Sequence, residues 1–238
     1  MNNADSYSVA IMDFPDRDII LIVESQCEQV FRANACAKEP ITARWIRDIA
    51  HKGIFYDIGA NVGSYSLIAA SLMSGENVVV AFEPVFYNFF RLNENIILNK
   101  FSDIIIPLHI GLTNKNAVET VYLKSLGFGA TNRVLSVDKA DMFTRTLCLT
   151  LDEIVKTGTL PFPQHIKIDV DGDEVAVLMG GKETFNDSRL QSVMIEINES
   201  EQEQAAMIID ILLNSGFRLY EKEQLISKNG SNALFIRE

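Results

Sequence analysis

The feature that most constrains the fold of this chain is the segment FYDIGANVGSYS, residues 55–66. The apolar run at 54–58 is typical of a buried strand, and SYSLIAASLM at 64–73 is typical of a helix. Gly59 and Gly63 allow a tight turn between the two elements and let a ligand approach the backbone closely. Free N–H groups at the start of such a helix can bind that ligand. The segment therefore predicts an α/β fold with a ligand site where the strand ends.

Short apolar runs alternate with helix-like stretches along the rest of the chain, which is typical of βαβ units and a parallel sheet. The predicted strands lie at 19–24, 54–58, 78–82, 104–110, 165–170 and 192–197, and two more surround the turn signal Asn229-Gly230 between 217 and 237. The predicted helices lie at 39–51, 64–73, 87–99, 151–156 and 202–213, and another ends at Leu178. Residues 113–147 are less regular, and LKSLGFGATNRV at 123–134 suits a loop or lid. The pattern predicts an open sheet that ends in an antiparallel hairpin.

Length, charge and cysteine usage narrow the class of protein. With 238 residues, of which 47% are hydrophobic, the chain suits one large domain. The formal net charge of −11 disfavours a phosphate backbone as partner, and no basic run with interleaved aromatics offsets it. The sequence has no apolar stretch long enough for a membrane span and no basic-then-apolar leader, and its three scattered cysteines suit a reducing compartment. We therefore expect a cytoplasmic protein with no nucleic-acid partner and no membrane span.

An acidic residue at the end of the next predicted strand extends the ligand prediction. Glu83 follows VVVAF at 78–82, and Pro84 ends the strand. A carboxylate about twenty residues after a glycine turn is placed to accept hydrogen bonds from a ribose diol. In isolation, a solvated strand-end glutamate would be the simpler interpretation. Because Glu83 follows a glycine turn of this kind, a nucleoside site is the better interpretation.

The residues of the turn favour one nucleoside over another. A dinucleotide site uses G-x-G-x-x-G, and Asn61 stands where the second glycine would let a pyrophosphate approach the backbone. Asp57, just before the turn, would repel a pyrophosphate but suits an ammonium group and a sulfonium cation. This charge argument favours S-adenosylmethionine, and an enzyme that uses NAD or a similar dinucleotide is the alternative.

A second polar cluster lies at the predicted strand 165–170. Strand alternation puts Lys167 and Asp169 on one face, and it places Asp169 and Asp171 at the carboxyl end, where doubly wound sheets bind ligands. Glu196, near the end of the following strand, converges on the same edge. A carboxylate there can take a proton from an acceptor hydroxyl, and Asp169 is the first candidate for that base, followed by Asp171.

Other interpretations of this cluster stay open. Asp173 and Glu174 are most simply a helix-start charge pair that complements the helix dipole. Lys167 is interpreted either as part of the catalytic group or only as a salt-bridge partner. A divalent ion held by Asp169, Asp171 and Glu196 is the less favoured alternative to a site without metal, and none of the histidines forms a metal-ligand pair.

Several motifs follow one another in order: DIGANVGSYSLIAA (57–70), VVVAFEPVFYNFFRLNENIILN (78–99), LDEIV (151–155), HIKIDVDGDEVAVLMGG (165–181) and SVMIEIN (192–198). With them the chain resembles the FkbM family of methyltransferases over roughly residues 37–200. The resemblance implies a doubly wound, mostly parallel seven-stranded sheet of the Rossmann-like methyltransferase type. It implies S-adenosylmethionine as cofactor and methyl transfer to a hydroxyl of a small molecule, sugar or glycan. It also implies one domain over 1–238, with an N-terminal extension (1–38) and a catalytic core (39–238).

The resemblance assigns cofactor contacts position by position. The residues at the methionine end and its turn are Asp57, Gly59, Ala60, Asn61 and Gly63. Glu83, with Pro84 beside it, would hold the ribose, and Gly111 and Leu112 would flank the adenine.

Three positions depart from the family pattern. Thr113-Asn114 stands where an acidic residue often occurs, Asp171 replaces the usual glutamate, and Asn198 stands where a histidine is frequent. The last two departures concern the acceptor more than the cofactor. They leave open a protein that binds S-adenosylmethionine without catalysis.

Overall fold

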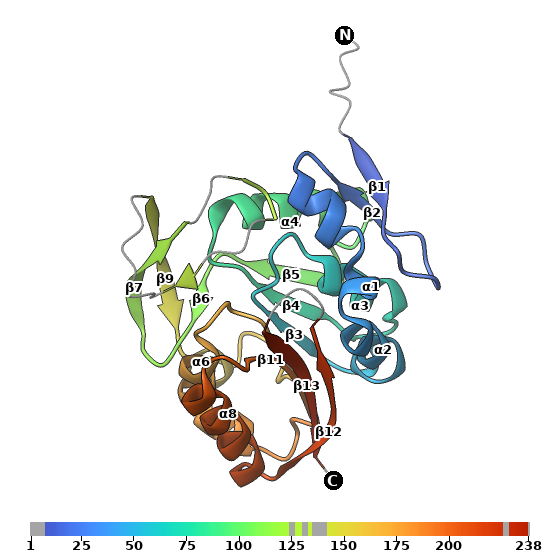
Figure 1. Ribbon diagram of the computed structural model, residues 1–238. Helices are drawn as coiled ribbons and strands as arrows, with labels where there is room; N and C mark the ends of the chain where they lie inside the picture. Colours follow the sequence, from blue (N-terminus) through green and yellow to red (C-terminus); the bar gives the residue numbers. More distant parts are fainter. Residues whose placement is uncertain (1–7, 124–126, 130–132, 135–141, 226–228, 238) are drawn as a thin grey trace.

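The computed structural model describes residues 8–123, 127–129, 133–134, 142–225 and 229–237 (Figure 1). Its centre is a seven-stranded sheet in the order β12-β13-β11-β10-β3-β4-β5. The strands are β3 (Phe55–Ile58), β4 (Val79–Phe82), β5 (Ile105–Leu108), β10 (His165–Ile168), β11 (Ser192–Asn198), β12 (Phe217–Gln224) and β13 (Gly230–Arg237). Only β13 runs antiparallel to its neighbours β11 and β12 among these strands. The predicted doubly wound, mostly parallel sheet with a C-terminal antiparallel hairpin is confirmed.

Alternation along the central strands divides the buried side chains between two apolar layers. Phe55 and Ala81 belong to one layer, and their chain neighbours Tyr56 and Val80 belong to the other. The first layer also holds buried residues of α2 (Pro40–Asp48), α3 (Ser64–Leu72) and α4 (Phe86–Leu98), with the short α1 (Ala35–Lys38) beside them. The second holds residues of α5 (Leu151–Lys156), α6 (Glu174–Gly180), α7 (Lys182–Asn186) and α8 (Gln202–Asn214). Helices therefore cover both faces of the sheet.

The N-terminal segment packs into the first apolar layer. It forms the hairpin β1 (Val9–Ile11) and β2 (Ile20–Ile22), followed by a π-helical turn over Glu28–Arg32. Its buried side chains Met12, Phe14, Ile19 and Leu21 join the layer under α3 and α4. Beyond α2, a short 3₁₀ turn at Ala50–Lys52 leads into β3. The segment is thus a structural part of the region that carries the turn after β3.

No strands were predicted in the irregular segment 113–147, but the structure has strands in much of it. β7 (Ala117–Tyr122) and β9 (Phe143–Leu149) pair antiparallel, and β6 (Gly111–Leu112) and β8 (Arg133–Val134) complete a second sheet in the order β6-β9-β7-β8. The alternation was obscured because the cross-strand pair Val118 and Leu147 is exposed, so apolar residues do not mark the buried face. Much of the expected loop or lid at 123–134 lies outside the described residues, namely 124–126 and 130–132, and so do 135–141.

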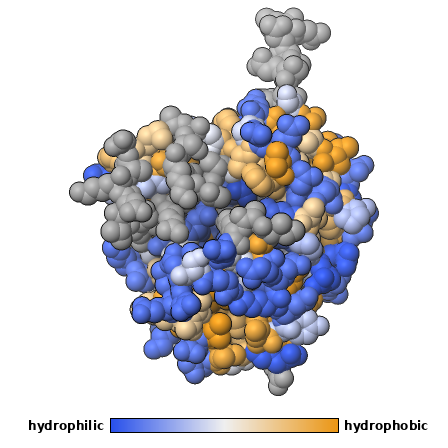
Figure 2. All heavy atoms as spheres, viewed as in Figure 1, coloured by the Kyte–Doolittle hydropathy of each residue, from blue (hydrophilic) through white to orange (hydrophobic). Residues whose placement is uncertain are grey.

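The exposed apolar side chains on the viewed face are scattered over several elements. In Figure 2 they gather partly around the N-terminal hairpin, where Val9 and Ile11 are exposed. Within the described ranges, every helix is too short or too polar to cross a bilayer.

We predict that Asn95→Ala destabilises the protein by about 2–4 kcal/mol, because two buried backbone groups lose their partner. The Asn95 side chain accepts from Ile22 N at 2.9 Å and donates to Val62 O at 2.9 Å. It thereby ties β2 to the turn before α3. Urea denaturation measures the loss. Asn93→Ala is the control, because its side chain donates to Phe89 O of its own helix. Equal losses in the two variants would contradict the prediction.

Candidate functional site

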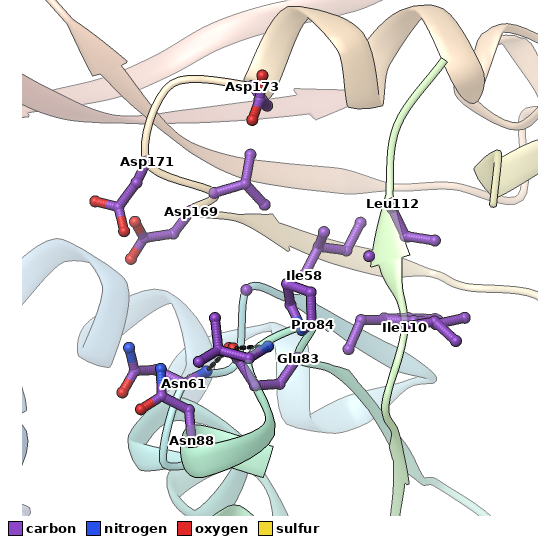
Figure 3. Close-up of a pocket in the computed structure, with 15 residues that line it drawn as sticks. Ile58, Asn61, Glu83, Pro84, Asn88, Ile110, Leu112, Asp169, Asp171 and Asp173 are labelled. Atoms are coloured by element: carbon purple, nitrogen blue, oxygen red, sulfur yellow. Dashed lines mark hydrogen bonds between the residues drawn. The ribbon is translucent and has the colours of Figure 1, made fainter. Parts of the chain in front are cut away.

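A hollow opens at the carboxyl ends of β3, β4 and β10. Figure 3 shows Glu83, Asn61 and Asn88 on one side, Asp169, Asp171 and Asp173 on the opposite side, and Ile110 and Leu112 along a third. The remaining lining residues are Ile58, Gly59, Phe82, Pro84, Val85, Gly111 and Val170. Six of the residues predicted to contact the cofactor therefore line one space.

The turn after β3 has the backbone geometry that its glycines predicted. Gly59 has φ +85°, and a Cβ there would lie 2.0 Å from Asp169 O, so no other residue fits without moving the backbone. Gly63 has φ +95° and abuts Leu92. Asn61 also has a positive φ, of 54°, and its N–H points to the next strand end. The turn thus brings one backbone donor and one side-chain amide to the hollow.

Glu83 is held at the end of β4 by backbone donors. Its Oε2 accepts from Asn61 N at 2.8 Å, and its Oε1 accepts from Val85 N at 2.8 Å. Burial raises the pKa of Glu83 to about 7, although these two hydrogen bonds favour the charged form. The carboxylate lines the hollow in a fixed orientation and can accept hydrogen bonds from a vicinal diol.

The apolar side of the hollow comes from the segment that joins β5 to β6. Ile110, Gly111 and Leu112 line it, as Gly111 and Leu112 were predicted to do. A Cβ at Gly111 would lie 2.7 Å from Cys148 Sγ, so a glycine keeps this side close to β9. Thr113 is buried beside Gly180 and is not part of the lining. This side can accept a flat ring by packing on either face.

The acidic side of the hollow is the loop between β10 and α6. Asp169, Asp171 and Asp173 line it, and Asp171 has a positive φ of 56°. Lys167 Nζ donates to Asp169 Oδ2 at 2.8 Å, and the Asp169 side chain is 16% exposed. Asp173 is also the N-cap residue of α6, as its interpretation as a helix-start charge predicted. Its position in the lining of the hollow was not predicted from the sequence.

Beneath the acidic side lies a buried charge cluster. Lys167 lies opposite Asp57 in the β3–β10 register, and its ammonium sits 4.7 Å from the Tyr65 ring centroid. Burial alone would lower the pKa of Lys167, but three carboxylates raise it well above its usual range. They belong to Asp169, Glu39 and Asp57.

Asp57 lies in this cluster and does not line the hollow. It is fully buried and accepts from Ser66 Oγ at 2.6 Å. Burial raises its pKa, against the opposing effect of Lys167. Ala60 and Gly63 also lie in the turn without lining the hollow. Direct contact of these three residues with a ligand remains a prediction.

Glu196 and Asn198 on β11 lie outside the lining of the hollow. Glu196 is half-buried and pairs in register with Asn232 of β13. Asn198 donates to Glu201 Oε1 at 2.9 Å and accepts from Ser200 N at 3.1 Å, so it shapes the turn before α8. In the described part of the chain, no group of three or more histidine, cysteine or acidic side chains is arranged to hold a metal ion.

Two polar residues in or beneath the site were not predicted from the sequence. Asn88 is buried and lines the hollow from the first turn of α4. Its position five residues after Glu83 was the available signal. Glu39 is fully buried beside Lys167, although a glutamate just before a helix usually indicates only a surface cap. Burial alone would raise the pKa of Glu39, but Lys167 and Lys38 hold it below its usual value.

Together these features fit a nucleoside joined to a cationic group. Glu83 offers a diol acceptor, the segment around Leu112 offers an apolar slot, and Asp169 offers negative charge across the hollow. A pyrophosphate finds no complementary charge on that acidic side.

Comparison with known proteins agrees with this arrangement. The chain matches the family model described as "Methyltransferase FkbM domain" over residues 57–219. It is similar to hexuronic acid methyltransferase AglP of Haloferax volcanii, with 28% identity over 154 residues. That match spans 64% of this chain and 60% of the relative.

Solved structures share the fold at low sequence identity. The FkbM methyltransferase of Methylobacillus flagellatus has a TM-score of 0.55 and 14% identity, and the match covers 78% of this chain and 44% of that protein. Fibrillarin of Aeropyrum pernix, solved with natively bound S-adenosyl-L-methionine, has a TM-score of 0.51 and 11% identity, with coverage of 83% and 74%. These likenesses establish the methyltransferase fold.

We predict that the Glu83 carboxyl group titrates with a midpoint near the raised pKa of about 7. Because burial favours the neutral form, Glu83 stays protonated at pH 5 and ionises as the pH rises through neutrality. Carbon-13 NMR of glutamate side chains from pH 4 to 9 measures the midpoint, and Glu83→Gln assigns the signal. A midpoint below pH 5 would contradict the prediction.

Proposed function

The chain belongs to the FkbM methyltransferase family, and on that premise we propose that it transfers a methyl group from S-adenosylmethionine to a hydroxyl oxygen of a small molecule or glycan. The observation that carries the proposal is the hollow that joins Glu83 to Asp169, which offers a diol acceptor and a carboxylate on opposite sides of one space.

The residues of the hollow fit the proposed cofactor at each of its parts. Glu83 would accept from the ribose hydroxyls, since its two oxygens are already oriented by Asn61 N and Val85 N. Gly111 and Leu112 would pack against the adenine ring. Asp169 would face the charged methionine end. When bound, S-adenosylmethionine supplies an electrophilic methyl group on a sulfonium.

Asp169 is the proposed base for the acceptor hydroxyl. Its carboxylate lines the hollow, and Lys167 binds one of its oxygens, Oδ2, which fixes the orientation of the group. A carboxylate held in this way can take a proton from a hydroxyl of the acceptor. Asp171 lines the same side and is the second candidate. Glu196 stays a weaker candidate because it lies outside the lining.

The proposed acceptor is a polyol such as a sugar. Support comes from the relative named as a hexuronic acid methyltransferase, which this chain matches over 60% of that protein's length. The acidic side of the hollow offers several acceptors for sugar hydroxyl groups. A polar, carboxylate-lined site of this kind favours hydroxyl recognition over an apolar acceptor.

We predict that the purified protein binds S-adenosylmethionine selectively over NAD in calorimetric titration. Glu83→Ala should weaken that binding by about tenfold to a hundredfold, the usual worth of hydrogen bonds to a charged group. Asp57→Ala should weaken the binding less, because Asp57 lies outside the lining of the hollow and acts through its hydrogen bond with Ser66 of α3. Glu203→Ala, an exposed change on α8, is the control. Unchanged affinity in both site variants would contradict the cofactor assignment, and selective NAD binding would contradict the proposed function.

We predict that Asp169→Asn lowers methyl transfer at least a hundredfold, since a general base contributes about 10²–10⁴ in rate. A screen of hexoses, hexuronic acids and other polyols, read by mass spectrometry, first identifies an acceptor that becomes O-methylated. The variant should retain S-adenosylmethionine binding within a few-fold, with Asp171→Asn as the matched comparison. Normal turnover by Asp169→Asn would remove this residue as the base.

A further inference from the structure

The short segment Gly127–Gly129 is anchored to the N-terminal part of the chain. Gly129 O accepts from Arg32 Nε at 3.1 Å and from Arg32 Nη2 at 2.7 Å. Cys27 Sγ donates to the same oxygen at 3.0 Å, and Ser25 Oγ donates to Phe128 O at 2.9 Å. Gly129 has φ +76°, so the turn itself favours glycine. Two segments about a hundred residues apart therefore meet through two neighbouring backbone oxygens.

Asn88 connects this anchor to the hollow. Its Oδ1 accepts from Gly129 N at 3.0 Å, and its side chain also hydrogen-bonds to the Glu83 carboxyl group. Both ends of the amide are thus used, and the residue is buried. An amide held at both ends has one orientation, which fixes the donor that faces Glu83. A continuous chain of contacts runs from Arg32 through Gly129 and Asn88 to Glu83.

Arg32 also acts on Glu83 through its charge. The residue is only 8% exposed, and Ser64 Oγ donates to its backbone oxygen at 3.1 Å. Among the described residues, no carboxylate lies within ion-pair distance of its guanidinium. Its attraction lowers the pKa of Glu83, in opposition to burial. The other charged groups that line the hollow are the carboxylates of Asp169, Asp171 and Asp173 on the opposite side.

The neighbouring Arg91 has a different role. Its guanidinium binds the carboxylates of Glu24, Glu28 and Glu94, and it lies 4.1 Å from the centroid of the Phe128 ring. Its charge is neutralised locally, so it supports the packing of the N-terminal segment. Arg32 donates to a neutral carbonyl instead. Its positive charge therefore attracts the Glu83 carboxylate and lowers the pKa of that group.

We propose that Arg32 is a positioning residue of the nucleoside site, which holds Gly129 and Asn88 against the Glu83 carboxylate. A consequence is that loss of the Arg32 charge disfavours the ionised carboxylate. The inference rests on the proposed function, because it takes Glu83 as the acceptor for the ribose hydroxyls. It adds a residue from a part of the chain that precedes the matched family region, residues 57–219.

The test is the pH dependence of S-adenosylhomocysteine binding, measured by calorimetry from pH 6 to 8.5. In the wild-type protein the affinity should fall about tenfold from pH 8 to pH 6, because the fraction of ionised Glu83 falls by that factor around a pKa of about 7. Arg32→Gln keeps a donor for Gly129 but loses the charge. Its midpoint should move to higher pH, with affinity at pH 7 at least threefold weaker.

Two controls separate charge from structure. Arg32→Lys keeps the charge and should keep the midpoint, and Arg44→Gln removes an exposed arginine paired with Glu221 and should change nothing. A merely structural role would lower the melting temperature and weaken binding equally at every pH. An unmoved midpoint in Arg32→Gln would overturn the inference.

A second measurement uses the wild-type protein alone. Because Gly129 N donates to the same Asn88 that bonds Glu83, S-adenosylhomocysteine should slow amide exchange at Gly129 at least fivefold. An unchanged exchange rate in the bound protein would overturn the link between the loop and the site. Absence of any S-adenosylhomocysteine binding by the wild type would overturn the proposed function itself, and this inference with it.

Discussion

The structure depends on the close approach of two backbones at the carboxyl ends of β3 and β10. Gly59 sits so near Asp169 O that any side chain at this position would clash. That contact sets the path of the turn after β3. The turn then directs Asn61 N toward Glu83. It also holds Asp169 at the edge of the hollow. The two strand ends that carry the proposed cofactor and acceptor chemistry are therefore positioned by one steric constraint.

The charges of the site are arranged in two groups with different surroundings. Glu83 is buried among neutral donors, and Arg32 is the cation that acts on it. Lys167 is surrounded by the carboxylates of Glu39, Asp57 and Asp169 and contacts the Tyr65 ring. A buried ammonium with several carboxylates is strongly held, since loss of any partner leaves a charge in a low-dielectric interior. The hydrogen bond from Lys167 in this cluster keeps the Asp169 carboxylate oriented. The hollow lies between Asp169 on one side and Glu83 on the other.

Strong local patterns made the parallel core predictable. The strands β3, β4 and β10 and the helices α3 and α5 were expected within one or two residues, because each combines an apolar run of the right length with clear turn residues. β7 and β9 were missed because their outward residues, such as Val118 and Leu147, are apolar too. Their pairing depends on a partner strand more than twenty residues away, which a local pattern does not report.

The sequence by itself determined the order of strands and helices in the parallel core, the glycine turn, and the identity of many groups that line the hollow. Glu83 was predicted because it directly follows a predicted strand, and Asp169 because it lies near the carboxyl end of another, where parallel strands share one edge of a sheet. Gly111 and Leu112 were predicted through the resemblance to the FkbM family. Only the tertiary structure decided that Asp57 and Glu39 lie beside Lys167 beneath the hollow, that Glu196 lies outside it, and that Asn88 lines it. The contact of Arg32 with Gly129, behind Asn88, is likewise decided by the tertiary structure. The physical reason is that burial and long-range contacts assign these roles. A carboxylate becomes a ligand acceptor or an internal counterion according to which charges and helices the fold packs against it.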